Sequence, residues 1–191
     1  MERYKNINSI NEVKKVLGGF QELYKEKDAS DVDDYINKVF SSNDGLAVLG
    51  SGMGQWCFNI EDINSLIKSH LSNENNYWED VNFKFEEANI FANENVAWII
   101  SIGIIKNILS EDKYIEDTIE KVKEILGGEN KCKTNALKAT IKMANTLRQI
   151  AQGEDYTWPF RFTSTLIKEN GTWKFHQLIC SKYTTPSRLT T

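Results

Sequence analysis

Ionisable side chains on apolar faces are the candidates for acid–base chemistry in this sequence. General acid or base catalysis needs a carboxylate or a histidine whose pKa an apolar environment moves toward neutrality. His70 lies on the apolar stripe of a helix predicted to begin at Asn59, and Glu87 continues the face of Phe83 and Phe85 in a predicted strand. Both are candidate bases. A packed histidine at a helix end and a solvated glutamate in a bulge are the structural alternatives.

Two tyrosines are candidate hydrogen-bond donors to a carbonyl or an enolate. Tyr24 lies on the apolar stripe of a helix predicted over residues 9–24, and Tyr35 lies on that of a helix predicted over 30–40. A position on an apolar stripe also suits simple packing into a core, so both interpretations stay open.

A pair of polar residues on the apolar face of a predicted hairpin is the main candidate for ligand binding. The hairpin runs over residues 157–183 and turns at Asn170-Gly171, the strongest short-range signal for such a turn. The register that this turn sets places Ser164 opposite Gln177 and directs His176 to the other face. The apolar members of the same inner face are Trp158, Phe160, Phe162, Leu166, Phe175 and Ile179.

Ser164 and Gln177 either satisfy each other and rigidify the sheet, or orient a ligand in an apolar pocket. Neither side chain titrates near neutral pH, so the pair suits binding better than catalysis. Aromatic residues complete the predicted ligand-binding set, although aromatic side chains are equally typical of a core. They are Trp56, Trp78, Trp158 and Phe162.

The elements that must position these residues follow from the period of the apolar positions. A period of 3.6 predicts a third helix over residues 59–71, and a period of 2 predicts strands with a bulge at Glu86-Glu87. A helical pair over about 107–155 interrupts the strands. No linker rich in proline or serine surrounds it, so we expect one domain over 1–191 with a helical insertion. The remaining strands are expected at 46–49, 55–58 and 96–105.

Composition excludes several classes of protein. With 191 residues, of which 40% are hydrophobic, the chain can bury a real core. Its net charge of -4 argues against a nucleic acid or an anionic membrane as the main partner. Three scattered cysteines (Cys57, Cys132 and Cys180) predict no disulfide framework and no metal site, and no cofactor motif stands out. With no apolar leader and no stretch long enough to span a membrane, we expect a cytoplasmic protein.

Two stretches of the sequence resemble the nuclear transport factor 2-like superfamily, nearest its SnoaL-like branch. The run Lys168-Glu-Asn-Gly-Thr-Trp-Lys-Phe175 is similar to the closing hairpin of SnoaL-like proteins. Residues 42–63 resemble the short strand pair that precedes the third helix in that branch. The resemblance implies an α+β cone. In such a cone a curved mixed or antiparallel sheet wraps around about three N-terminal helices and leaves a cavity at its open end.

The resemblance also implies a range of functions. The superfamily contains ketosteroid isomerase, polyketide cyclases, dehydratases and non-catalytic dimerisation modules. Many SnoaL-like proteins carry a histidine on the last strand, where Gln177 and Ile179 are expected to face the cavity here. We therefore predict binding of a small apolar molecule in the cone. The alternatives are a cofactor-independent lyase or isomerase and a dimerisation module. The outer face of the sheet often pairs two subunits in this superfamily, so a homodimer is expected.

Overall fold

The computed structural model describes residues 6–27, 30–51, 55–71, 78–107, 110–127, 133–151 and 157–182, the side chains of Trp78, Glu79, Asn107 and Gln149 excepted. The chain forms two compact units. Residues 1–105 and 158–191 form the first, which we call the cone unit, and residues 106–157 form the second, the helical hairpin. No helix within the described ranges is long and apolar enough to cross a membrane.

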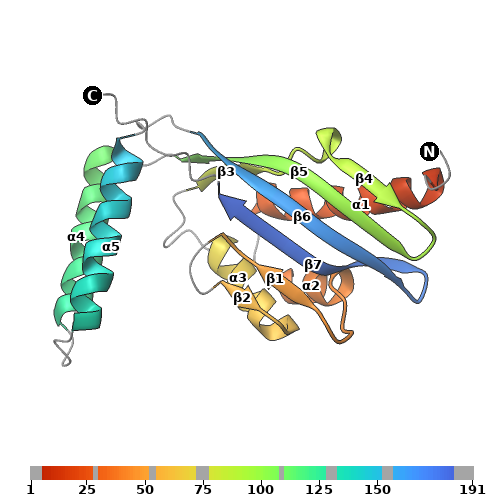
Figure 1. Ribbon diagram of the computed structural model, residues 1–191, viewed down its shortest axis with the longest axis horizontal. Coiled ribbons are helices and arrows are strands. Elements are labelled where there is room, and N and C mark those ends of the chain that lie inside the picture. Colours follow the sequence, from red (N-terminus) through yellow and green to blue (C-terminus); the bar gives the residue numbers. More distant parts are fainter. Residues whose placement is uncertain are drawn as a thin grey trace. The chain divides into compact units, whose positions relative to one another are not determined.

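Three helices lie on one face of the sheet of the cone unit (Figure 1). They are α1 (Ile7–Glu26), α2 (Val32–Val39) and α3 (Ile60–Leu71). The predicted start of α1 at Ser9 is wrong by two residues. Asn6 caps the helix, and its side chain accepts a hydrogen bond from the Ser9 backbone N–H at 3.2 Å. Asparagine caps a helix as well as serine does, so the helix can begin after Asn6.

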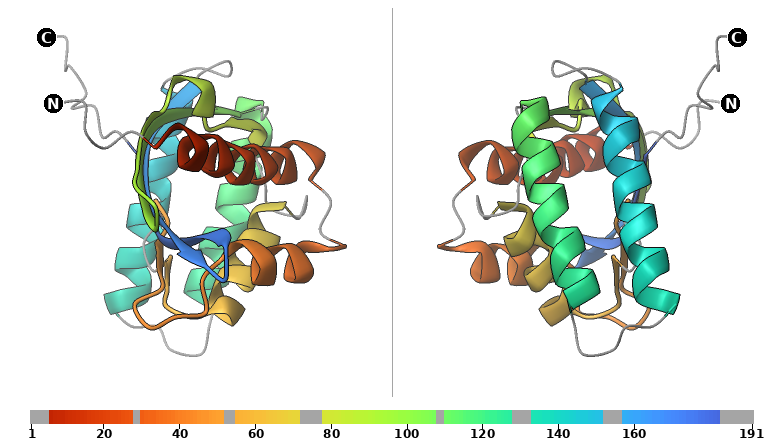
Figure 2. Two further views of the ribbon diagram at one scale, coloured as in Figure 1. Left: turned by 90° about the vertical axis from the view of Figure 1, so that its right-hand side faces the viewer. Right: turned by 90° about the vertical axis from the view of Figure 1, so that its left-hand side faces the viewer.

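Seven strands form one mixed sheet in the order β2-β1-β7-β6-β5-β3, with β4 also paired to β5. The sheet bends around α1, as the left view of Figure 2 shows. The predicted α+β fold class is therefore confirmed. The strands are β1 (Ala47–Leu49), β2 (Trp56–Cys57), β3 (Trp78–Asn82), β4 (Asn89–Ala92), β5 (Val96–Asn107), β6 (Thr157–Glu169) and β7 (Thr172–Lys182).

The predicted break in the strand near Glu86 is a short 3-10 helix, η1 (Phe85–Glu87), between β3 and β4. Two side chains satisfy the backbone groups that the break releases. Gln21 on α1 donates to the carbonyl of Val81 at 2.8 Å and accepts from the N–H of Phe83 at 2.7 Å. Ser101 on β5 donates to the carbonyl of Phe83 at 2.8 Å. The break is thereby fixed to both the helix and the sheet.

The closing hairpin turns at Asn170-Gly171 as predicted, and both residues have positive φ, as a type I′ turn requires. The predicted register holds near the turn, where Leu166 pairs with Phe175. Beyond this pair β7 contains one extra residue, His176, so Thr165 pairs with Gln177. The predicted pairing of Ser164 with Gln177 is wrong, because a bulge shifts the register by one and reverses the faces of the residues beyond it.

The helical hairpin contains α4 (Glu111–Gly127) and α5 (Lys133–Ile150), and the predicted helical pair is confirmed. Besides one tyrosine, Tyr114, the described side chains buried in this unit are small or polar. Thr118 and Thr146 are buried and hydrogen-bonded at 2.9 Å, and Ala139 is also buried. Large apolar side chains of both helices remain exposed, among them Leu126, Leu137 and Leu147.

Replacing Gln21 by leucine should destabilise the cone unit. The substitution leaves the carbonyl of Val81 and the N–H of Phe83 without their partner, and an unpaired buried backbone group costs about 1–3 kcal/mol. We expect the free energy of unfolding, measured by urea denaturation, to fall by about 2 kcal/mol. Glu22→Ala on the exposed side of the same helix is the control, with an expected change below about 0.5 kcal/mol. Equal losses of stability in the two variants would show that the two hydrogen bonds of Gln21 do not stabilise the cone unit.

Candidate functional site

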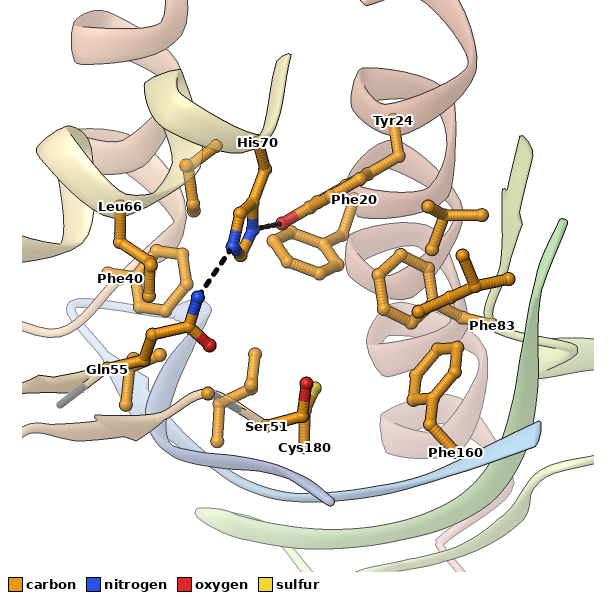
Figure 3. A pocket seen from close by; sticks show the side chains of 16 residues that line it. Phe20, Tyr24, Phe40, Ser51, Gln55, Leu66, His70, Phe83, Phe160 and Cys180 are labelled. Carbon is orange, nitrogen blue, oxygen red and sulfur yellow. Dashed lines mark hydrogen bonds between the residues drawn. The ribbon is translucent and has the colours of Figure 1, made fainter. Parts of the chain in front are cut away.

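A small, mostly apolar cavity lies inside the cone unit, between α1, α3 and the inner face of the sheet (Figure 3). It offers about 60 Å³ to the centre of a water-sized sphere. On that scale one water needs roughly 10–15 Å³, and sites for drug-sized ligands measure roughly 300–1,000 Å³. Only a small molecule fits. The cavity is lined by Phe20, Tyr24, Phe40, Val48, Gly50, Ser51, Gln55, Leu66, Ile67, His70, Val81, Phe83, Ile105, Phe160, Leu178 and Cys180.

Three polar side chains from distant parts of the chain meet at the cavity: Tyr24 on α1, His70 on α3 and Gln55 just before β2. His70 stands between the other two, with its Nδ1 atom 3.2 Å from the hydroxyl of Tyr24 and its Nε2 atom 3.4 Å from the amide nitrogen of Gln55. Figure 3 shows the imidazole pointing toward the cavity from above, with one partner on each ring nitrogen. We call these residues the His70 triad.

Local sequence patterns bring the triad together. Tyr24 follows Leu17 and Phe20 on the buried stripe of α1, and His70 follows Ile67 on the buried side of α3. Apolar stripes of amphipathic helices face a core, so the two polar side chains enter it with their neighbours. Gln55 precedes β2 and arrives from the turn that follows β1.

The apolar surroundings keep the titratable groups of the site uncharged at neutral pH. Burial lowers the pKa of His70 to about 4, and the nearby positive charge of Lys182 acts in the same direction. Burial raises the pKa of the Tyr24 phenol far above its ordinary value and that of the Cys180 thiol to about 12. The site therefore presents neutral hydrogen-bonding groups. A base whose conjugate acid has a pKa near 4 is weak at neutral pH.

The structure brings together two of the four predicted catalytic candidates, His70 and Tyr24. The hydroxyl of Tyr35 is buried away from this cavity and has no hydrogen-bond partner among the described residues. It lies close to Gly19, where an added Cβ would be 3.1 Å from it. Glu87 is solvent-exposed in η1, and its carboxylate lies 3.6 Å from the ammonium group of Lys84.

The predicted ligand-binding residues lie elsewhere. Of the six, the five with described side chains are absent from the cavity lining, and the side chain of Trp78 lies outside the described residues. Ser164 is buried and donates to the backbone carbonyl of Gln177 at 2.6 Å. The side chain of Gln177 is exposed, so its predicted inner position is wrong.

The three aromatic members of that set have different environments. Phe162 is completely buried in the core, and Trp158 is partly buried against it. Trp56 is 66% exposed on β2, so it does not line the cavity. These aromatic side chains pack in the core or lie at the surface. Their spacing in the sequence did not distinguish such positions from positions that line a pocket.

Sequence reasoning missed Gln55, Leu178 and Cys180. The bulge at His176 turns Leu178 and Cys180 inward, although simple alternation predicts that they face outward. The sequence Gly50-Ser-Gly-Met-Gly54 precedes Gln55, and this run of glycines, of which residues 52–54 lie outside the described ranges, was the available signal. His176 itself lies 3.4 Å from the Ser41 hydroxyl, which in turn donates to Glu169.

The described part of the chain contains no group of three histidine, cysteine, aspartate or glutamate side chains that could hold a metal ion. The side chains of the triad can form hydrogen bonds and transfer protons.

The lowered pKa of His70 predicts a pH-dependent stability. Between pH 6.5 and pH 4 the unfolded chain takes up a proton at His70 that the folded chain does not, so stability falls as the pH falls. Between pH 7 and pH 5 the loss from this residue is about 2 kcal/mol. His70→Asn should remove this part of the loss in urea denaturation at the two pH values. An identical loss in the variant would show that His70 is not buried in its neutral form.

Comparison with known proteins identifies the fold. No family model matches the sequence, and neither does any curated protein. Among solved structures, a provisionally named dehydratase of the nuclear transport factor 2-like family from Streptomyces avermitilis is similar, with a TM-score of 0.57 and 8% identity. The match covers 95% of this chain and 100% of that one.

Two further structures have related folds and different names. A provisionally named scytalone dehydratase from Novosphingobium aromaticivorans has a TM-score of 0.56 at 9% identity, over 95% of this chain and 88% of that one. A provisionally named calcium/calmodulin-dependent protein kinase II association domain from Xanthomonas campestris has a TM-score of 0.51 at 8% identity, over 90% and 88%. At such identities the likeness concerns the fold, and the predicted resemblance is confirmed at that level: the chain has the nuclear transport factor 2-like fold.

Proposed function

We propose that this chain is a SnoaL-like protein whose cone unit binds a small, mostly apolar molecule with one polar group. The observation that carries the proposal is the hydrogen-bonded pair of His70 and Tyr24, 3.2 Å apart, at a cavity whose other walls are largely apolar. A few convergent polar groups in an apolar cavity are the usual composition of a small-molecule site. The apolar part of the ligand would contact rings such as Phe83 and Phe160, and its polar group would meet the triad.

A cofactor-independent lyase or isomerase is the second candidate. A histidine within hydrogen-bond distance of a tyrosine hydroxyl supports it, and two of the structural neighbours carry provisional names as dehydratases. In this mechanism His70 would take a proton from the substrate while Tyr24 donates a hydrogen bond to the developing oxyanion. The low pKa of His70 favours binding over this catalysis, because the imidazolium that forms would be poorly solvated.

We also propose a homodimer that forms through the outer face of the sheet. Large apolar side chains on this face are about half exposed, and exposed apolar patches mark interaction sites. Phe91 on β4 pairs with Trp98 on β5, and further along β5 Ile100 and Ile102 point the same way. Arg161, Thr163 and Thr165 on β6 supply a polar part, a mixture typical of interfaces. A neighbour named as an association domain has the same fold.

Ligand binding can be tested with Tyr24→Phe. Cyclopentanone, which is small, apolar and carries one polar group, serves as the probe, and binding is followed by chemical-shift changes in the cavity residues. We expect Tyr24→Phe to weaken binding about fivefold, since a neutral hydrogen bond contributes about 1 kcal/mol. Tyr35→Phe is the matched control, because that hydroxyl lies outside the cavity. If the chemical shifts of the cavity residues in the wild type do not change at the highest probe concentration used, the cavity does not admit the molecule and the binding proposal fails.

The same samples test the catalytic alternative. An enzyme with His70 as base should exchange the α-protons of cyclopentanone for deuterium faster than buffer does, and His70→Asn should abolish this acceleration. Exchange at the buffer rate in the presence of bound probe would exclude proton abstraction from this ketone and leave binding as the function.

The dimer can be tested with Trp98→Glu. A carboxylate at the centre of the outer face should prevent desolvation of the interface and give a monomer by light scattering at micromolar concentration. Glu94→Lys, in the exposed turn between β4 and β5, is the control that changes surface charge away from the apolar side chains. A wild-type chain that is monomeric, or a Trp98→Glu variant that still dimerises, would contradict the proposed interface.

A further inference from the structure

Gln55 reaches His70 through space that the absence of a side chain at Gly50 provides. A Cβ atom added at Gly50 would overlap the Gln55 side-chain oxygen and lie 2.7 Å from the Gln55 Cβ. Real Cβ atoms essentially never make non-bonded contacts this short, so a larger residue at position 50 requires the Gln55 side chain to move. The N–H of Gly50 also donates to the backbone carbonyl of Gln55 at 2.7 Å, which holds the two residues together. Gly50 and Gln55 thus form one positioning device.

The orientation of the Gln55 amide determines which ring nitrogen of His70 carries the proton. The amide nitrogen faces Nε2 of His70 at 3.4 Å (Figure 3). The amide oxygen is the atom that a Cβ at Gly50 would approach most closely. An amide nitrogen only donates, so Nε2 must accept. A neutral imidazole then carries its proton on Nδ1, which donates to the hydroxyl oxygen of Tyr24 at 3.2 Å.

The tautomer of His70 in turn determines whether the Tyr24 hydroxyl can donate a hydrogen bond to a ligand. A phenol that accepts from an N–H cannot donate its own proton back to the same nitrogen. Among the described residues the Tyr24 hydroxyl has no other hydrogen-bond partner, and its side chain lines the cavity. A buried O–H without an acceptor is unfavourable, so the hydroxyl favours a ligand that supplies one.

We propose that Gly50 and Gln55 hold His70 in its Nδ1–H tautomer, so that Tyr24 presents a hydrogen-bond donor to the cavity and selects ligands with a carbonyl-type acceptor. The ligand part of this statement rests on the proposed small-molecule binding. The tautomer part concerns the chain itself. Gln55 also lines the cavity, and we call it a positioning residue because the selection proposed here passes through His70 and Tyr24.

If the Gln55 amide were turned the other way, Tyr24 would prefer a ligand that donates a hydrogen bond. If the Gln55 oxygen faced the imidazole, Nε2 would carry the proton and Nδ1 would accept from the Tyr24 hydroxyl. Tyr24 would then offer only its oxygen lone pairs, and a donor such as an N–H group would bind better. Gln55→Glu creates this arrangement without a change of side-chain length, because a carboxylate only accepts.

The tautomer can be measured directly by nitrogen NMR of the histidine rings in the full chain. The sequence contains only two histidines, so the signals of His176 are an internal reference for the intact fold. At pH 7.5 we expect the wild-type His70 to show a protonated Nδ1 and an unprotonated Nε2. Gln55→Glu should reverse the two, and Gly50→Ala and Gln55→Leu should shift the tautomer ratio at least about threefold toward Nε2–H.

A wild-type His70 protonated on Nε2, or a tautomer that none of these substitutions changes, would overturn the inference. Both outcomes are independent of any ligand. The positioning role can therefore fail while small molecules still bind, and it can hold while none of them does.

Ligand selection is tested with two five-membered rings, cyclopentanone as a pure acceptor and pyrrole as a pure N–H donor. We expect the wild type to prefer cyclopentanone by about fivefold, and Gln55→Glu to invert this preference, as one neutral hydrogen bond allows. If the tautomer reverses and the preference does not, Tyr24 does not select by its donor and that part of the proposal is wrong. If neither ring binds the wild type, the carbonyl selection fails together with the proposed function, and the NMR result still decides the positioning role.

Discussion

One extra residue in β7 decides which side chains of the closing strand face the inside of the cone. Because His176 has no partner on β6, the strand changes sides between Phe175 and Gln177. Leu178 and Cys180 turn inward and become walls of the cavity, while Gln177 becomes exposed. The β1 strand pairs with this part of β7 and β2 pairs with β1, so Gly50 and Gln55, which flank these two short strands, are positioned by the same shifted register. The site therefore depends on the bulge as much as on its own residues.

Much of the fold follows from local patterns in the sequence, and the site follows only in part. Helical stripes predicted α1 to α5, and Asn170-Gly171 predicted the final turn. The same stripes placed Tyr24 and His70 on buried faces. The side of β7 could not be predicted, because Leu178, Ile179 and Cys180 are all apolar and therefore fit a regular strand and a bulged one equally well. The sequence did not predict Gln55 as a site residue, because a glutamine in a loop is ordinarily solvated and its role depends on contacts with a helix distant in sequence.

The helical hairpin follows a different principle from the cone unit. Among the residues described there, the buried side chains are few: a hydrogen-bonded threonine pair, Ala139 and one large ring, Tyr114. Charge also distinguishes its helices, since α4 begins with acidic residues whereas the charged residues of α5 are all basic. Opposite charges on neighbouring antiparallel helices stabilise such a pair, although exposed ion pairs contribute little individually. Leu126, Leu137 and Leu147 are left exposed by this arrangement.

The neutral state of the His70 triad constrains what the cavity can be for. Removing an imidazole and a phenol from water costs free energy, and the hydrogen bond between them does no more than compensate for that cost. Apolar side chains of the same volume would fill the space without it. The lowered pKa of His70 adds a loss of stability in mild acid. Leucine and phenylalanine, which are already six of the sixteen lining residues, would serve better if the site were only packed core. A polar cluster that is kept neutral, aligned by a glutamine and given room by a glycine is instead suited to the recognition of one neutral polar group.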